Sequence, residues 1–202
     1  ESVKIHVRSS FTDTSGTWVV TEEESMEKAI VSGIAHDITE AKLTLVGVPD
    51  RPGIAATLFR ALAEEGLNID MIVQNVSAEG KTDISFTVPR DDAARASETV
   101  ARVASQIGAA GHDLDTGIGK VSLVGAGMRS HPGVAAQMFE VLAAAGINIE
   151  MISTSPIRIS CVIREEAVPE AVRRLHEAFK AELEEAAGRP TLTEESDSAH
   201  GS

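Results

Sequence analysis

Apolar and polar side chains alternate along residues 42–48, which is the pattern of a β-strand that buries one face. The spacing then changes, because Ile54, Leu58 and Leu62 recur every four residues and form one apolar stripe on a helix. Pro52 suits the first turn of that helix, where its missing N–H costs nothing. The pattern therefore predicts a strand followed by an amphipathic helix.

The same two periods continue along the first half of the chain. Gly66 suits the C-terminal end of the helix, and alternation over 69–73 and 84–88 predicts two more strands. A second helix is expected from about residue 89, with one apolar face at Ala96, Val100, Val103 and Ile107. Residues 111–118 can supply a last strand, which gives the order strand, helix, strand, strand, helix, strand.

An internal repeat organises the whole chain. Residues 42–47 return as 120–125, and residues 52–72 align without gaps to 132–152, with twelve of 21 positions identical. The period of about 80 residues is too long for a solenoid, whose repeats span about 20–50 residues. The repeat therefore predicts two copies of one small domain.

The second copy follows the same course but ends without a fourth strand. Its strands are expected at 121–124, 147–152 and 157–163, and its helices carry apolar residues at Val134, Met138, Val141 and Leu142, then at Ala171, Val172, Leu175 and Phe179. A missing strand leaves an exposed sheet edge. Residues 28–36 precede the first copy and look like an unused strand. We expect them to complete the second copy, so that the first copy is inserted within it.

Composition narrows the classes of function. The formal net charge is −13 over 202 residues, whereas nucleic acid and anionic membranes bind clustered Lys and Arg, so neither is an expected partner. Cys161 is the only cysteine, which excludes an internal disulfide and a thiolate metal cluster, and no metal site is expected. Without a signal peptide or a membrane-length apolar run, the protein is expected to be cytoplasmic. Because the sequence does not begin with Met, we expect a piece of a longer protein.

Several segments resemble aspartate kinases. Residues 46–53 (VGVPDRPG) and 66–75 (GLNIDMIVQN) resemble the first ACT domain of that family. Residues 120–134 (KVSLVGAGMRSHPGV) and 148–155 (NIEMISTS) are similar to the second, and residues 5–19 resemble the end of the catalytic domain. The resemblance implies an α+β fold of two ferredoxin-like βαββαβ ACT domains.

The resemblance also implies a domain division and a set of partners. The expected parts are 1–25 as the end of the kinase domain and linker, 40–118 as the first ACT domain, 26–39 with 119–186 as the second, and 187–202 as a disordered tail. The family's active site lies upstream in a Lys-Phe-Gly-Gly region absent here. No catalytic residue or cofactor is therefore expected in this region, and ATP and Mg belong to the absent kinase domain. The family assembles through ACT–ACT contacts, as homodimers or as α2β2 assemblies whose small subunit starts internally, at a position that Met26 resembles.

An amino-acid sensor needs donors for a carboxylate and acceptors for an ammonium group. Each Pro-Gly stands at a helix N-terminus, where unpaired N–H groups attract anions. Glycine also lets a ligand approach the backbone closely. By resemblance, threonine binds between ACT domains of two subunits. The residues expected there are Asp50, Gly53, Ile54, Ala55, Asn68, Ile69, Gln74, Asn148 and Ile149.

A second effector site, for lysine or another amino acid, is expected in the second copy. Its residues are Met128, Ser130, His131, Gly133, Val134 and Glu150. The family usually has a Glu before Ile-Arg-Ile-Ser that contributes to lysine recognition in some members, and here Pro156 replaces it. Proline removes a carboxylate and a backbone donor, which predicts weak or altered lysine sensing.

Simpler interpretations of these residues stay open at this point. Asp50 suits helix capping, which is the commoner role of Asp at such a position. Ser130 or His131 can cap the second helix. Asn68 and Asn148 suit turns after a helix, and Gln74 suits a solvated strand position. Recurrence in two copies favours binding.

The predicted function is feedback inhibition of an aspartate kinase, which phosphorylates L-aspartate with ATP in lysine, threonine and methionine biosynthesis. Two rival functions remain: a structural dimerisation module, and an ACT sensor that serves another enzyme.

Overall fold

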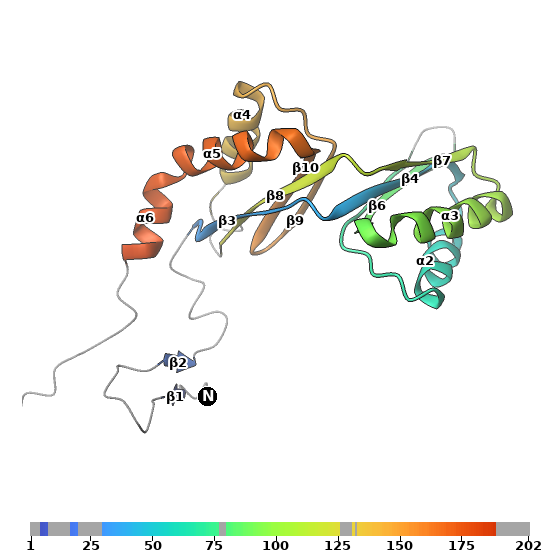
Figure 1. Ribbon diagram of the computed structural model, residues 1–202, viewed down its shortest axis with the longest axis horizontal. Coiled ribbons are helices and arrows are strands. Elements are labelled where there is room, and N and C mark those ends of the chain that lie inside the picture. Colours follow the sequence, from blue (N-terminus) through green and yellow to red (C-terminus); the bar gives the residue numbers. More distant parts are fainter. Residues whose placement is uncertain are drawn as a thin grey trace, which may run out of the picture.

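The computed structural model describes residues 5–7, 17–19, 30–76, 80–125, 131 and 133–188. Figure 1 shows two modules side by side, joined by two extended crossings of the chain. Strands β1 (Ile5–Val7) and β2 (Thr17–Val19) form a separate antiparallel pair in the segment expected to end the kinase domain. The expected tail 187–202 begins within a helix, because residues 187 and 188 end α6 (Lys180–Gly188). Residues 189–202 and Met26 lie outside the described residues.

The first module is one continuous run of chain. Its sheet has the antiparallel order β5-β6-β4-β7, and its two α-helices pack on that sheet through a shared apolar core. Its elements are β4 (Glu40–Pro49), α2 (Ile54–Glu64), β5 (Ile72–Val76), β6 (Lys81–Pro89), η1 (Arg90–Asp92), α3 (Ala93–Ile107) and β7 (Gly111–Asp115). The order is that predicted from the alternating periods.

The second module is completed by a strand that precedes the first module in sequence. Strand β3 (Gly33–Asp37) pairs antiparallel with β8, and the sheet order is β3-β8-β10-β9. The remaining elements are β8 (Ile118–Val124), α4 (Val134–Ala144), β9 (Met151–Ser155), β10 (Arg158–Arg164), η3 (Glu165–Ala167) and α5 (Val168–Ala178), followed by α6 (Lys180–Gly188). The expected insertion of one copy within the other is therefore confirmed.

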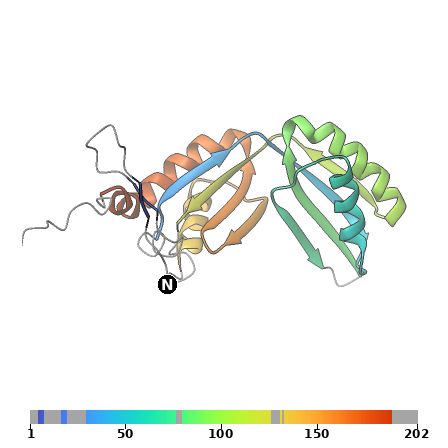
Figure 2. The same ribbon diagram turned by 90° about the horizontal axis from the view of Figure 1, so that it is seen from below.

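The helices of each module lie on the far side of its sheet from the other module, as Figure 2 shows. Each module has its own buried core on the helical side. A third, small core joins the modules, where Met71, Ile118, Met151 and Val162 are buried together. Because Met71 belongs to the first module and the other three belong to the second, this small core makes an apolar interface between them.

Several element boundaries differ from those expected. Helix α2 starts at Ile54 with Gly53 as its N-cap, so Pro52 lies in the preceding turn and not in the first helical turn. The strand expected from Ile69 begins at Ile72. The strand expected over 28–36 occupies Gly33–Asp37. In each case the spacing of apolar residues predicted the element. Its boundary differs from the prediction because it depends on backbone turns that hydropathy does not encode.

A β-bulge shapes the end of β4 that faces the candidate site. The pairing of β4 with β6 shifts register between Leu45 and Val48, and Gly47 adopts a positive φ of 62° there. The Asp83 carboxylate accepts the Gly47 N–H at 2.7 Å. A bulge bends its strand and redirects the chain beyond it, and here it sets the direction in which the 49–53 loop leaves the sheet.

Candidate effector site

A cavity of about 430 Å³ opens where β4 ends and α2 begins. The loop and the first residues of α2 line one side, and Gln74 of β5 with Thr82 of β6 lines the other. Five residues of the predicted threonine set lie in its wall: Asp50, Gly53, Ile54, Ala55 and Gln74. The cavity is also lined by Pro49, Arg51, Pro52 and Thr82. The structure thus brings together the predicted residues of the Pro-Gly loop and the first turn of α2 with Gln74 of β5.

The N-terminus of α2 supplies donors to this cavity. Gly53 is its N-cap, with a φ of 95° that glycine adopts without strain. The Gly53 carbonyl accepts the Thr57 N–H at 2.9 Å and the Thr57 hydroxyl at 3.0 Å, which closes the first turn. The N–H groups at the start of any helix have no helical acceptor and attract negative charge. This end of the cavity therefore suits a carboxylate.

Asp50 and Arg51 place opposite charges beside those donors. The Asp50 N–H donates to the Gly80 carbonyl at 2.9 Å, which fastens the loop to the β5–β6 hairpin. Both side chains are exposed, and neither has a hydrogen bond or ion pair with any residue that the structure describes. Asp50 does not cap α2, because Gly53 is the N-cap and no side chain bonds there. A carboxylate and a guanidinium side by side match an ammonium and a carboxylate.

The other four residues of the predicted threonine set do not line the cavity. Asn68 and Ile69 follow the opposite end of α2, and a helix of 11 residues is about 16 Å long. Asn148 and Ile149 occupy the equivalent place after α4. Both asparagines are exposed, while the isoleucines are half-buried against the cores of their own modules. One copy of the chain therefore does not unite the full set.

The predicted second site is only partly described. Met128 and Ser130 lie outside the described residues, and His131 is exposed. Gly133 repeats the geometry of Gly53, with a φ of 114° at the N-cap of α4, and Val134 is the first, buried residue of that helix. The Gly133 carbonyl accepts the Gln137 N–H at 2.8 Å. The helix start is thus repeated in the second module.

Comparison with known proteins identifies the two modules. The family model for the ACT domain matches residues 43–103 and 121–179, one stretch in each module. The regulatory subunit of aspartate kinase from Thermus thermophilus, solved in a ligand-free form, superposes with a TM-score of 0.71 at 45% identity. The match covers 74% of this chain and 99% of that one.

The chain belongs to the aspartokinase family, as a tandem-ACT regulatory region. An aspartokinase from Mycolicibacterium smegmatis is 56% identical over 182 residues, which is 88% of this chain and 43% of the relative. The aspartokinase of Corynebacterium glutamicum is 48% identical over 183 residues. The chain therefore spans less than half the length of the curated relatives it matches.

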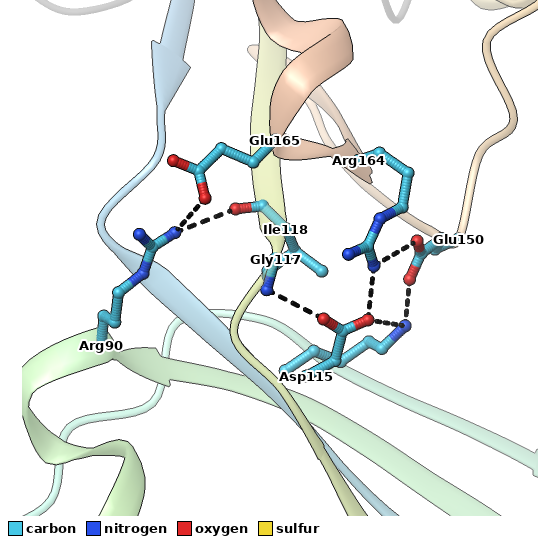
Figure 3. Close-up of polar contacts among 8 residues, drawn as sticks. Arg90, Asp115, Gly117, Ile118, Glu150, Arg164 and Glu165 are labelled. Carbon is cyan, nitrogen blue, oxygen red and sulfur yellow. Dashed lines mark hydrogen bonds and ion pairs between the residues drawn. The ribbon is translucent and has the colours of Figure 1, made fainter.

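In this aspartokinase region, Glu150 lies at the boundary between the modules and beyond the far end of α4 from Gly133. Its carboxylate pairs with Lys42 of the first module and accepts a hydrogen bond from Arg164 at 3.2 Å. Arg164 also donates to Asp115 at 2.5 Å, as Figure 3 shows. The expected second-site residue is thus part of a network of ion pairs.

The charges around Glu150 shift the pKa of their neighbours. Burial raises the pKa of Asp115, but hydrogen bonds from Arg164 and from the Gly117 N–H outweigh that effect and hold it below the ordinary value. The hydrogen bonds to Asp115 and Glu150 raise the pKa of Arg164. Asp115 and Arg164 therefore both stay charged near neutral pH.

Three further features of the aspartokinase region bear on its chemistry. Cys161 is fully buried, and burial raises the pKa of its thiol to about 12, as expected of a small core residue. The described residues contain no group of three His, Cys, Asp or Glu side chains that could hold a metal ion. Among the helices of the described part, none is long and apolar enough to cross a membrane.

Sequence reasoning missed two polar residues of the cavity. Arg51 lies inside the motif that carried the resemblance, and its cationic side chain next to Asp50 was a usable signal. Thr82 gave none, because it reaches the cavity only through the pairing of β5 with β6, where its hydroxyl donates to the Asn75 carbonyl.

Proposed function

We propose that this chain is the amino-acid-sensing part of an aspartate kinase and that threonine binds in the Asp50 cavity. Threonine binding would lower the ATP-dependent phosphorylation of L-aspartate by the complete enzyme, whose ATP and Mg sites belong to its kinase domain. The observation that carries the proposal is the cavity at the N-terminus of α2, where the side chains of Asp50 and Arg51 have no hydrogen bond or ion pair with a described residue. Membership of the aspartokinase family supplies the enzyme that such a sensor would control.

Each group of threonine has a counterpart in the cavity wall. The N–H groups of the first turn of α2 and the Arg51 guanidinium suit its carboxylate. The Asp50 carboxylate suits its ammonium. Gln74 and Thr82 offer hydrogen bonds to the hydroxyl, and Ile54 and Ala55 offer apolar contact to the methyl group. Valine lacks the hydroxyl and would lose the hydrogen bond to Gln74, which is the basis for selecting threonine over valine.

Assembly with a second subunit would complete the site. Asn68 and Asn148 lie outside the cavity of their own chain, so a partner subunit must supply such residues if they contact threonine. Ile72 on β5 and Ile152 on β9 occupy equivalent positions on outer strands and are 53% and 43% exposed. A homodimer or an α2β2-type assembly through ACT–ACT contacts would cover them, and one similar solved structure is of aspartokinase alpha and beta subunits.

The regulatory step follows from differential affinity. Threonine shifts the complete enzyme toward an inhibited state only if it binds that state more tightly than the active one. A coupling free energy of about 1–3 kcal/mol is typical of such regulation. We place the enzyme in the cytoplasm, where free amino acids and ATP meet. Lysine, or another amino acid, is the candidate effector of the second module.

The test is calorimetric titration of the purified chain with threonine. The wild type should bind threonine and bind valine more weakly, and Asp50→Ala should lose threonine binding. Asp113→Asn is the matched control, because Asp113 is an exposed carboxylate of the same module outside the cavity.

A wild-type chain that does not bind threonine in this titration would overturn the proposal. If such a chain still dimerised through the strands that carry Ile72 and Ile152, the alternative of an assembly module would stand. Sedimentation of the wild type and of Ile72→Lys reports on that alternative.

A further inference from the structure

Each ACT module pairs one of its lysines with an acid of the other module, so the ion pairs across the boundary are reciprocal. Lys42 on β4 and Lys120 on β8 are equivalent residues in the repeat, and so are Asp70 and Glu150. Lys42 of the first module pairs with Glu150 of the second, while Lys120 of the second module pairs with Asp70 of the first at 2.5 Å. Each lysine therefore reaches the acid that stands before the second strand of the opposite module.

The outer strands β3 and β7 each add an aspartate beside one of these lysines. Asp37 on β3 is the register partner of Lys120, and Asp115 on β7 is the register partner of Lys42. Each aspartate also accepts a backbone N–H two residues further on, from Thr39 and Gly117, at the two points where the chain crosses between modules. The crossings and the ion pairs thus share the same carboxylates.

The two halves of this network differ in charge balance. Around Lys120 lie three carboxylates, those of Asp37, Glu40 and Asp70, at 3.9, 2.6 and 2.5 Å. Arg158 acts on Asp70 through its charge, without a hydrogen bond in the described structure. Among the described residues, Lys120 is therefore the only cation that forms ion pairs with these three acids.

Around Lys42 the charges balance. Its neighbours Asp115 and Glu150 are two acids, and both also receive hydrogen bonds from Arg164. The position equivalent to Arg164 in the first module is Pro89, because each of the two residues precedes the short helix that follows the third strand. Loss of Lys42 would leave Arg164 in place, whereas loss of Lys120 would leave its three carboxylates facing one another across the boundary.

Apolar contacts and one more ion pair make the boundary a defined interface. Met71 and Met151, equivalent residues directly after Asp70 and Glu150, are buried with Ile118 and Val162 between the modules. Arg90 donates to Glu165 at 2.8 Å on one side of it (Figure 3). A shift of either acid therefore moves a methionine that the opposite module also contacts.

We propose that Lys120, and more weakly Lys42, are positioning residues that fix the angle between the two ACT modules. Asp70 and Glu150 follow Asn68 and Asn148 by two residues, so the same ion pairs set where those asparagines stand. The effect on effector binding rests on the threonine site proposed above. The proposal that Lys120 fixes the angle between the modules does not depend on the threonine site, and it can be tested without a ligand.

The first test measures the distance between the modules. Nitroxide labels at Gln106→Cys on α3 and His176→Cys on α5 occupy exposed positions, and the buried Cys161 stays unlabelled. The labelled wild type should give one narrow distance distribution, and Lys120→Met should give a broader or displaced one. Lys42→Met should stay close to the wild type. Lys120→Arg, or Lys120→Met combined with Glu40→Gln and Asp70→Asn, should recover the narrow distribution.

An unchanged distribution in Lys120→Met, or equal broadening in Lys42→Met, would overturn the proposal. The second test is threonine titration of the same variants, in which Lys120→Met should weaken binding by about tenfold and Lys42→Met by much less. A broad distance distribution with unchanged threonine affinity would overturn the link to binding. If the wild type itself does not bind threonine, the proposed function fails, while the distances still decide whether Lys120 sets the angle.

Discussion

The loop cavity and the inter-module network use the same kinds of residue in opposite ways. At the cavity, the side chains of Asp50 and Arg51 are exposed and have no hydrogen bond or ion pair with a described residue. At the boundary, the Lys120 side chain is 10% exposed and surrounded by three acids. Removal of one partner from a shielded ion pair leaves an uncompensated charge and is destabilising, while charges left open at a helix N-terminus are available to a ligand. The comparison predicts that mutations at the boundary lower stability, while mutations at the cavity lower ligand binding with little effect on stability.

The largest expected effect is on stability at the boundary. Lys120→Met leaves three carboxylates without their lysine and should lower the free energy of unfolding by about 3 kcal/mol. Asp50→Ala should change it by less than about 0.5 kcal/mol, because the side chain is exposed and has no hydrogen bond or ion pair with a described residue. Urea unfolding followed by circular dichroism measures both. Equal losses in the two variants would remove the distinction between the regions.

Threonine should protect the chain through the cavity alone. At about 100 times its dissociation constant, a ligand that binds only the folded state adds about 2.7 kcal/mol to the free energy of unfolding. The wild type and Asp113→Asn should gain this protection, and Asp50→Ala should not. Thermal unfolding with and without threonine is the measurement. Protection that survives in Asp50→Ala would place the ligand elsewhere.

Acid should weaken the boundary between the modules. The hydrogen bond from Lys120 lowers the pKa of Asp70 below its ordinary value of 3.8. Burial raises the pKa of Asp37, but hydrogen bonds from the Thr39 N–H and hydroxyl outweigh burial and lower that pKa below 3.8 as well. A depressed carboxyl pKa gives stability that is present above 3.8 and is lost as the pH falls through the lower, folded value. Stability should therefore be level near neutral pH and fall below about pH 4.

The matching variant for the acid prediction is Lys120→Met. Burial lowers the pKa of Lys120, but hydrogen bonds to Asp70 and Glu40 outweigh burial and raise it, so its own contribution is lost only as the pH rises above 10.5. Without Lys120 the pKa of Asp70 is no longer held down, and the loss of stability on acidification should become shallower. Urea midpoints between pH 7 and pH 3 measure this slope. An identical slope in both proteins would assign the acid sensitivity to other carboxyls.

The smallest expected effect concerns lysine. Pro156 lies exposed in the turn between β9 and β10, where it supplies neither a carboxylate nor an N–H. Lysine should bind the wild type more weakly than threonine does, and Pro156→Glu should strengthen lysine binding by a few-fold. Calorimetry with lysine, with Glu166→Gln as a control for charge in the same module, tests this. Micromolar lysine binding by the wild type would contradict it.

The repeat and its periodicity predicted both modules and the insertion of one within the other. The second copy lacked a fourth strand, and an extra strand was predicted before the first copy. Because an open sheet edge is unfavourable, the extra strand was expected to complete the sheet of the second copy. The start of α2 could not be predicted as well, since a positive φ at Gly53 decides it and Pro52 alone suggested an earlier turn.

The candidate site was predicted only in part. Asp50 and Gly53 of the loop meet Ile54 and Ala55 of α2 in the cavity, and Gln74 joins them from β5. Asn68 does not, because the length of α2 separates it from the loop. The network around Lys120 was not predicted at all. The recurrence of Lys42 as Lys120 was visible, but its partners depend on the angle between two modules, which no local pattern encodes.

The most direct measurement is threonine inhibition of the complete aspartokinase from which this region comes. The wild-type enzyme should phosphorylate aspartate and lose activity as threonine is added. Asp50→Ala in the same enzyme should keep its activity without threonine and resist inhibition, while Asp113→Asn should behave as the wild type. An Asp50→Ala enzyme inhibited by threonine as strongly as the wild type, or a wild type insensitive to threonine, would contradict the account.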